Sequence, residues 1–272
     1  MISVIILAGG VGSRMKEVGT AIPKFLLPVH EEILLLRTLR QIFKSNFCQI
    51  IICVQLEYIE WIDVLIDHLG GEKKSKIQIV PSRELSLLDS LACVGKVLSD
   101  GKTPLLVLGD VYYVGNPFIG LSDINVEGDI LVGKMISQIS EMHNGGVIET
   151  QGLDTVIRVA KHPTTDIKRG AIWSGMALCG EGFFEDIEEL IRDKEHVNLN
   201  LEDIFEYRNR KYHNSRIRDS GDFVNINSPI HHAYANLLAL AYSGSANDNV
   251  KKTALLCADE VKELILKNGE QL

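Results

Sequence analysis

The sequence lacks the features that mark several specialised classes of protein. No apolar run approaches the ~20 residues that a membrane span needs. No basic segment precedes the short apolar run at 2–7, so we expect no signal peptide. The cysteines are few and scattered, without the spacing of a metal site. We therefore predict reduced thiols in a cytoplasmic protein, with disulfides as the alternative. The cysteines are Cys48, Cys53, Cys93, Cys179 and Cys257.

Positive charge is also scarce. The formal net charge is −8 at pH 7, whereas a protein that binds nucleic acids displays a basic field. This balance argues against a general nucleic-acid partner, but a phosphorylated small ligand needs only a few local cations. The length of 272 residues allows one large domain, or a domain with a small appendage, and a substantial core.

The first half of the chain alternates between strand-like and helix-like patterns. Apolar runs that predict strands lie at 2–7, 50–55, 77–81 and 104–108. Patterns that predict helices lie between them at 32–44, 57–69 and 87–98. Short apolar strands that alternate with helices indicate βαβ units and a parallel sheet covered on both faces.

The second half is more irregular. We predict strands at 129–136 and 171–179, a hairpin formed by 146–149 and 154–160, and helices at 182–193, 201–210 and 229–242. We divide the chain into a catalytic domain, 1–242, and a linker with a C-terminal helix, 243–272. We expect this helix to pack on the domain or, in a homodimer, on a second subunit.

A glycine-rich stretch with two cations, Arg14 and Lys24, follows the first strand. Backbone N–H groups of such a loop can approach an anion without side-chain obstruction, which predicts bound phosphate. A P-loop is excluded because its Gly-x-x-x-x-Gly-Lys-Ser/Thr pattern is missing. The dinucleotide fingerprint fits poorly, because Met15 replaces its third glycine and because Pro23 and Pro28 interrupt the helix that should follow. A plain strand-to-helix turn would not need both cations.

The stretch LAGGVGSRM…PKFLLPV resembles the signature of the sugar-phosphate nucleotidyltransferases, L-A-x-G-x-G-[ST]-R-[LM] followed by P-K-x-L-x-P-[VI]. The matching residues are Leu7, Ala8, Gly10, Gly12, Ser13, Arg14, Met15, Pro23, Lys24, Leu26, Pro28 and Val29. The resemblance covers most of the chain. It implies a glycosyltransferase-A-like, Rossmann-like three-layer α/β/α fold with a mixed, mainly parallel sheet. It also implies transfer of an NMP from an NTP to a sugar phosphate or a related phosphorylated alcohol, which gives an NDP-sugar and pyrophosphate.

The residue types in this motif suit that reaction, which must hold two polyanions together and neutralise charge in the transition state. The planar Arg14 guanidinium suits the β- and γ-phosphates of the leaving pyrophosphate. The compact Lys24 ammonium suits the reacting α-phosphoryl group. Backbone N–H groups that we expect to cradle the triphosphate belong to Gly10, Val11, Gly12 and Ser13.

Chemistry of this kind usually requires Mg²⁺, which prefers oxygen ligands. Gly109-Asp110 ends a predicted central strand, where open α/β sheets bind ligands. This pair resembles the family's metal-binding Gly-Asp. The resemblance places the second ligand in NINSPIHHA, at Asn227 or at the neighbouring Asn225, where many relatives carry aspartate.

Two histidines, His231 and His232, follow within the predicted helix. We expect them to form a surface pair; the alternative is that one side chain points into the cleft. A zinc site is not expected, because no carboxylate or cysteine stands at ligand spacing.

The acceptor phosphate has its own candidate cation. VIRVAKHP resembles the family's Glu-Lys-Pro segment, which implies that Lys161 binds the sugar phosphate, although Ala160 replaces the glutamate. In WSGMALCGEGFF, Trp173 either stacks on a ring or belongs to the core. Glu202 either binds a hydroxyl group or stabilises the start of a helix.

The resemblance implies that the base contacts the end of the first strand and the loop after the third. The candidate nucleotide-binding residues there are Leu7, Ala8, Gly9, Ser82, Ser90 and Gly109, with Arg83 as a further contact. The nucleotide is CTP, UTP, dTTP or GTP, and the PSRELSLLDSL stretch looks most like relatives that use CTP. Two other functions stay open: a catalytically silent relative that binds nucleotide sugars, and an NAD(P)-linked oxidoreductase.

Overall fold

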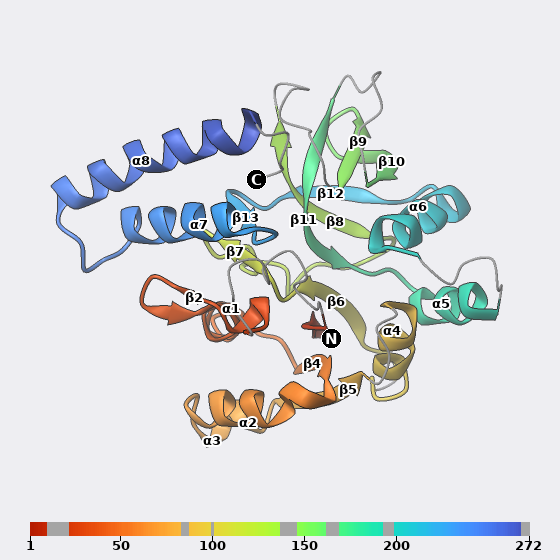
Figure 1. Ribbon diagram of the computed structural model, residues 1–272. Coiled ribbons are helices and arrows are strands. Elements are labelled where there is room, and N and C mark those ends of the chain that lie inside the picture. Colours follow the sequence, from red (N-terminus) through yellow and green to blue (C-terminus); the bar gives the residue numbers. More distant parts are fainter. Residues whose placement is uncertain are drawn as a thin grey trace.

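The computed structural model describes residues 1–9, 22–82, 87–98, 101–136, 146–161, 169–192 and 199–267. A nine-stranded sheet forms the centre of this part of the chain (Figure 1). In spatial order its strands are β5 (Ile77–Ser82), β4 (Gln49–Gln55), β1 (Ile2–Leu7), β6 (Thr103–Leu108), β11 (Gly170–Leu178), β8 (Ile130–Ile136), β12 (Arg216–Asp219), β10 (Thr155–Ala160) and β9 (Val147–Gln151).

The sheet changes character between β6 and β11. Strands β5, β4, β1 and β6 are all parallel, so their carboxyl ends meet at one edge. Strand β11 runs antiparallel to β6, and β9 pairs with both β10 and β11. Because β9 bonds to a strand on each side, it is not a free edge. In the described part of the chain, β5 is the edge strand of this sheet.

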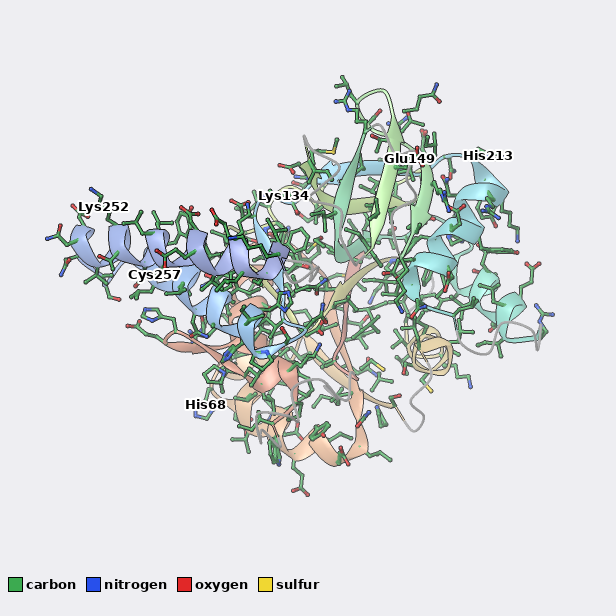
Figure 2. The ribbon with its side chains drawn as sticks, turned by 45° about the horizontal axis from the view of Figure 1, so that its top comes forward. His68, Lys134, Glu149, His213, Lys252 and Cys257 are labelled. Carbon is green, nitrogen blue, oxygen red and sulfur yellow. The ribbon has the colours of Figure 1, made fainter. Side chains whose placement is uncertain are left out.

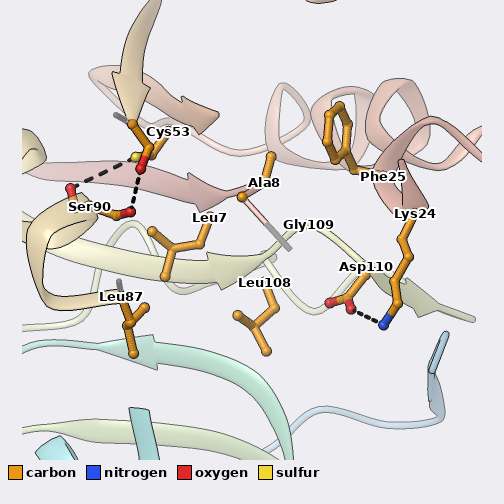
Figure 3. Close-up of a pocket in the computed structure, with 12 residues that line it drawn as sticks. Leu7, Ala8, Lys24, Phe25, Cys53, Leu87, Ser90, Leu108, Gly109 and Asp110 are labelled. Carbon is orange, nitrogen blue, oxygen red and sulfur yellow. Dashed lines mark hydrogen bonds and ion pairs between the residues drawn. The ribbon is translucent and has the colours of Figure 1, made fainter. Parts of the chain in front are cut away.

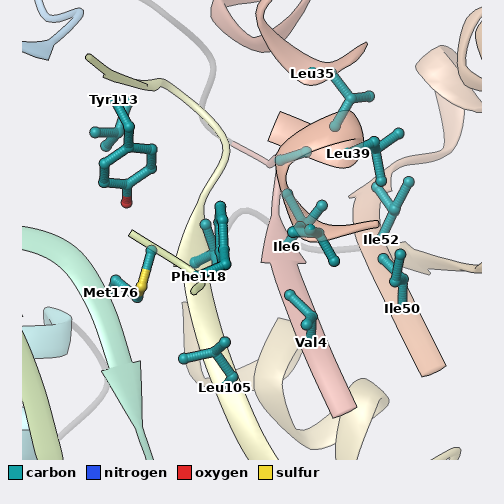
Figure 4. Close-up of a cluster of buried hydrophobic side chains, with 14 of the residues drawn as sticks. Val4, Ile6, Leu35, Leu39, Ile50, Ile52, Leu105, Tyr113, Phe118 and Met176 are labelled. Atoms are coloured by element: carbon teal, nitrogen blue, oxygen red, sulfur yellow. The ribbon is translucent and has the colours of Figure 1, made fainter. Parts of the chain in front are cut away.

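Helices cover both faces of the parallel half. Successive residues of a strand point to opposite faces, and in β1 the side chains of Val4 and Ile6 face one helical layer while Ile5 faces the other. Figure 4 shows Val4 and Ile6 packed with helix side chains. The first layer holds α1 (Leu34–Ile42), η3 (Leu56–Tyr58), α2 (Ile59–Asp67) and α3 (Gly71–Lys74); the second holds α4 (Leu87–Gly95), α5 (Phe183–Arg192) and α6 (Leu201–Tyr212). This is the predicted three-layer α/β/α arrangement.

Two small ribbons bring distant segments to the edge where the parallel strands end. The short helix η2 (Lys24–Leu26) leads into the ribbon of β2 (Pro28–Val29) and β3 (Glu32–Ile33). The other ribbon pairs β7 (Val111–Tyr113) with β13 (Phe223–Asn225). The second ribbon brings the segment that follows β6 next to the segment that precedes the helix starting at Pro229.

The C-terminal part of the described chain is helical. Helix α7 (Pro229–Ala241) begins after Ser228, with proline in its first turn, where the missing N–H is not needed. Helix α8 (Asp248–Lys267) packs along α7 and contributes Ala258 to a third apolar cluster (Figure 2). The division of the chain at residue 242 stays a prediction. Within the described residues, no helix has both the length and the apolar character needed to cross a membrane.

Most predicted elements are present, with shifted ends. The hairpin of β9 and β10 and the strand β11 are confirmed. The helix predicted at 32–44 is wrong at its start, because Glu32 and Ile33 pair with β2 and α1 begins at Leu34. All five cysteines are free, as expected.

A buried ion network joins the second helical layer to the sheet. Arg208 of α6 is only 2% exposed, and its guanidinium donates to both oxygens of Asp129, at 2.9 and 3.1 Å. It also bonds to Asp186 of α5. Glu181 accepts a further bond on its backbone oxygen, at 3.1 Å. The charged groups are thus paired and hydrogen-bonded, as burial requires.

Replacing Arg208 with methionine is expected to destabilise the fold by about 3 to 5 kcal/mol, because Asp129 then stays buried without its cation, although Asp186 keeps its bond to Lys211. The expected fall in the melting temperature, measured by circular dichroism, is roughly 10 °C. Arg210→Met is the matched control, since the Arg210 side chain is 74% exposed in its pair with Glu206 and such pairs contribute little. Equal melting temperatures for the two variants would contradict a structural role of this network.

Candidate functional site

A cavity of about 270 Å³ opens at the carboxyl ends of the four parallel strands. Strand β1 lies between β4 and β6, so the connections that leave β1 and β6 run to opposite sides of this point. Open α/β sheets bind ligands at such a position. The residues that line the cavity are Leu7, Ala8, Gly9, Lys24, Phe25, Cys53, Ser82, Leu87, Ser90, Leu108, Gly109 and Asp110. The structure therefore gathers several predicted nucleotide-binding residues around one space (Figure 3).

The strand ends are tied together beneath this cavity. Gly109 N–H donates to Leu7 O at 3.0 Å, and Ala8 N–H donates to Cys53 O at 2.8 Å. A Cβ atom at position 109 would approach Leu7 O to 3.1 Å, so glycine permits the close approach of β6 to β1. Gln55, at the end of β4, donates from Nε2 to Gly9 O at 3.0 Å. These bonds fix the strand end from which the glycine-rich stretch departs.

One end of the cavity is neutral and carries small polar groups. The hydroxyl groups of Ser82 and Ser90 lie 2.8 Å apart, which joins the end of β5 to α4. Cys53 contacts the same serine, with Sγ 3.8 Å from Ser90 O. Figure 3 places Cys53, Ser90 and Leu87 at the end opposite Lys24 and Asp110. The cavity therefore runs from a neutral end to a charged end.

Cys53 was expected only as a reduced core thiol, yet it also lines this cavity. Burial raises its pKa to about 11, and the hydrogen bond to Ser90 offsets part of that rise. The thiol is consequently protonated at neutral pH. It contributes a small polarisable surface and not a nucleophile.

The raised pKa predicts slow, pH-dependent alkylation of Cys53. Because only the thiolate reacts, labelling by iodoacetamide should rise about tenfold for each pH unit between pH 7 and 9, below the pKa of about 11. Peptide mass spectrometry measures the labelling, with the partly exposed Cys257 of α8 as the comparison thiol. A Cys53 rate that is flat over this range would contradict a protonated thiol.

The charged end is a cluster of three side chains from distant parts of the sequence. Lys24 Nζ lies 2.9 Å from Asp110 Oδ2 and 3.1 Å from Asn227 Oδ1. The Lys24 side chain is 10% exposed and that of Asp110 is 26% exposed, so the pair is shielded from water on most sides. The backbone supports the arrangement, because Ile226 N–H donates to Asp110 O at 3.0 Å.

The cluster distinguishes the two asparagines of the predicted second ligand. Asn227 points its carboxamide oxygen at the same ammonium as Asp110. Asn225 belongs to the β13 strand, and its backbone oxygen accepts from Asn227 N–H at 2.9 Å. Asn227 is therefore the asparagine whose side chain belongs to the site.

The oxygen atoms of this cluster fit Mg²⁺. One carboxylate oxygen and one amide oxygen already converge on a single cation, the Lys24 ammonium. Among the described residues, no group of three or more His, Cys, Asp or Glu side chains gathers around a metal-sized point. Two protein oxygens with remaining positions for water and phosphate are the arrangement that Mg²⁺ favours in nucleotide sites.

The remaining predicted site residues either fall outside the described part of the chain or are absent from the lining of this cavity. Those of the glycine-rich stretch, Gly10, Val11, Gly12, Ser13 and Arg14, fall outside the described residues, as does Arg83. Lys161 is not among the residues that line the cavity; its Nζ donates to Asn200 Oδ1 at 3.3 Å, near the start of α6. Its role toward an acceptor stays a prediction.

The expected surface pair of histidines is wrong. His231 is buried, with Nδ1 2.7 Å from Ser228 Oγ. His232 is partly buried, with Nε2 2.6 Å from Pro28 O. Both rings turn toward the domain because α7 packs against the ribbon that follows Lys24.

The alternative left open for Trp173 is decided by burial. Trp173 is a core residue: its ring packs edge-on against Phe205, and its Nε1–H donates to Met176 O at 2.8 Å. Helix α6 begins with a capping box formed by Asn200 and Asp203. Glu202 lies in the first turn of this helix, where a negative charge is favourable, and its binding of a hydroxyl group stays a prediction.

Comparison with known families identifies the family of this chain. The family model described as nucleotidyl transferase matches residues 3–222. The chain belongs to the nucleotidyl transferase family. The resemblance inferred from the glycine-rich stretch is thus confirmed, and the family contains sugar-phosphate nucleotidyltransferases and pyrophosphorylases. Comparison with curated proteins gives no match.

Solved structures of nucleotidyl transferases share the fold. One, from Bacillus anthracis, is described as a glucose-1-phosphate thymidylyltransferase; it has a TM-score of 0.73 at 18% identity, over 92% of this chain and 99% of that chain. The CTP:phosphocholine cytidylyltransferase of Streptococcus pneumoniae has a TM-score of 0.68 at 18% identity, over 86% and 97%. The inositol-1-phosphate CTP transferase of T. maritima has 0.67 at 15% identity, over 97% of each chain.

Proposed function

We propose that this nucleotidyl transferase moves an NMP group from an NTP to the phosphate of a sugar or a related phosphorylated alcohol. The observation that carries the proposal is the polarity of the cavity. A base fits the neutral end near Ser82, Ser90 and Cys53, and phosphate groups fit the charged end. There Lys24, Asp110 and Asn227 converge.

The reaction forms one bond and breaks one. An oxygen of the acceptor phosphate attacks the α-phosphorus, and the bond from the α-phosphorus to the bridging oxygen breaks, so that pyrophosphate leaves. Lys24 is placed to hold a non-bridging α-oxygen as negative charge develops there. Because its ammonium is largely buried, its attraction for that oxygen is weakly screened by water.

Asp110 and Asn227 would hold Mg²⁺ through the oxygens that now accept from Lys24. Bound there, the ion would supply Lewis-acid chemistry that neutralises charge on the phosphate groups. Asp110 provides the negative charge of the pair, and Asn227 provides a neutral oxygen. The protein's own task is to present both oxygens at one end of the β7/β13 ribbon, where Asp110 precedes β7 and Asn227 follows β13.

The remaining assignments complete the proposal. Arg14 and the N–H groups that follow Gly9 bind the leaving pyrophosphate, and Lys161 binds the acceptor phosphate. CTP is the first nucleotide to test, followed by UTP, dTTP and GTP. We place the enzyme in the cytoplasm, where nucleoside triphosphates are available.

The first test is a thermal-shift screen followed by a turnover assay. Each NTP is added with Mg²⁺, because a ligand that binds only the native state raises the melting temperature. Pyrophosphate release is then measured with a panel of sugar and polyol phosphates. We expect one NTP to stabilise the protein and to release pyrophosphate with a matching acceptor. Stabilisation by an NTP without pyrophosphate release from any acceptor favours a catalytically silent relative that binds nucleotide sugars. If no NTP stabilises the protein and no pyrophosphate is released, the proposal is refuted.

A further inference from the structure

The N-terminal half of α7 is bonded to the ribbon that follows Lys24. His232 Nε2 lies 2.6 Å from Pro28 O, and since a carbonyl only accepts, the ring nitrogen donates. Asn236 Oδ1 accepts from His30 N–H at 2.6 Å. Its other amide atom, Nδ2, donates to His232 O at 2.8 Å within the same helix. The His232 and Asn236 side chains are thus hydrogen-bonded to two backbone groups of the ribbon, Pro28 O and His30 N–H.

A third contact joins the same end of α7 to Lys24 itself. Asn227 stands just before the helix, and its Oδ1 accepts from Lys24 Nζ at 3.1 Å. The segment 227–236 therefore holds both the ammonium and the backbone that follows it. These contacts link residues about 200 positions apart in the sequence, so they are features of the tertiary structure.

The ribbon transmits its position to Lys24 over a short path. Leu27 N–H donates to Lys24 O at 3.1 Å, and Leu34 N–H donates to Leu27 O at 3.0 Å. Pro28, which His232 holds, comes directly after Leu27. A shift of Pro28 consequently moves the turn from which the Lys24 side chain extends.

Apolar packing alone does not set this position. Phe25, Leu27 and Val29 are buried, but the hydrophobic effect is non-directional and does not select one orientation of the ribbon's backbone groups. Hydrogen bonds have narrow distance and angle requirements. The bonds from His232 and Asn236 supply the directional restraint that the packing lacks.

The tip of the ribbon shows the same restraint. His30 has φ of 56°, in the left-handed region, which is unfavourable for a non-glycine residue. Its N–H is the group that Asn236 accepts. A residue held in such a conformation requires surroundings that favour it, and Asn236 is part of them.

We propose that His232 and Asn236 are positioning residues that hold the Lys24 ammonium at the reacting phosphate. The inference rests on the proposed function, since it concerns the same site, and it assigns to α7 a part in catalysis without contact to substrate. Neither side chain lines the cavity. Their effect passes through the ribbon to Lys24.

The kinetic test separates positioning from folding. His232→Ala is expected to lower kcat by about 10- to 100-fold, the effect of a small misplacement near the chemistry, while KM for the NTP changes little. His232→Gln, which restores an N–H donor of similar reach, should recover most of the activity. His68→Ala is the matched control, because His68 is exposed directly after α2 and its Nδ1 lies 2.7 Å from Val64 O of that helix, away from the ribbon.

A double-mutant cycle tests the route through Lys24. In a Lys24→Met background, His232→Ala should cause almost no further loss of kcat, because the group that it positions is gone. An equal loss in both backgrounds would overturn the proposal, as would a His232→Gln variant that folds but stays as slow as His232→Ala. If His232→Ala does not fold, the same cycle is made with Asn236→Ala.

A labelling experiment needs no turnover and so keeps the two proposals apart. Acetic anhydride acetylates accessible amines, and peptide mass spectrometry reports the rate at Lys24. We expect several-fold faster acetylation of Lys24 in His232→Ala and in Asn236→Ala than in the wild type or in His68→Ala. An unchanged rate would overturn the positioning role. A wild type that is inactive with every substrate pair, yet shows the expected acetylation pattern, would refute the proposed function alone.

Discussion

Lys24→Met is expected to lower kcat by about 10²- to 10³-fold, the cost of removing one charged donor from a phosphoryl-transfer transition state. Methionine keeps most of the side-chain volume in a site where Lys24 is 10% exposed. Asp110 is 26% exposed, so its carboxylate keeps contact with water on its open side when Lys24 is replaced, and the melting temperature should change little. The effect on KM for the NTP should be smaller, because the base end of the cavity is untouched.

Lys252→Met is the control for this prediction. Lys252 lies on the exposed side of α8 (Figure 2). Its replacement removes the same positive charge as Lys24→Met but does not affect the cavity. We expect wild-type kcat for this variant in steady-state assays of pyrophosphate release. Normal turnover of Lys24→Met would remove Lys24 from the reacting centre.

Asp110→Asn is expected to lower kcat by about 10³-fold, since several kcal/mol of charge stabilisation depend on the metal that Asp110 would hold. The substitution keeps the size of the side chain and an oxygen atom but removes the negative charge. The site would then offer two neutral amide oxygens, from position 110 and from Asn227, which bind a divalent cation weakly. Electron paramagnetic resonance of Mn²⁺ with NTP present should show weaker binding.

The control here is Asp123→Asn, in an exposed turn beyond β7. It removes one carboxylate from the same region of the sequence and should leave both kcat and Mn²⁺ binding unchanged. Equal Mn²⁺ affinity in Asp110→Asn and in the wild type would show that Asp110 is not a metal ligand, whatever happens to turnover.

The parallel half of the fold was predictable because of its burial. Strands such as β1 and β4 are covered on both faces, so their sequences are continuous apolar runs between helical patterns. The start of α1 was not predictable from the same signal. Glu32 and Ile33 continue its pattern, but tertiary pairing with β2 takes them into a ribbon.

The site was predictable in composition but not in arrangement. Resemblance to the family named Lys24, Asp110 and Asn227 separately; the sequence did not indicate that the lysine bonds to both oxygens, across 86 and 203 positions. His232 shows the same limit. Its place in a helical pattern gave no sign of Pro28 as its partner, because that contact depends on how α7 packs. The periodicity of a helix indicates which of its faces is buried, but it does not indicate which segment of the chain that face packs against.

The most direct test of the central claim follows the phosphorus atoms. The enzyme is incubated with Mg²⁺, an acceptor sugar or polyol phosphate, and the stabilising NTP labelled with ³²P at either the α- or the γ-position. Nucleotidyl transfer predicts that the α-label appears in the NDP-linked product and the γ-label only in pyrophosphate. Transfer of the γ-label to the acceptor, or hydrolysis to NMP without a labelled NDP-linked product, would contradict the account.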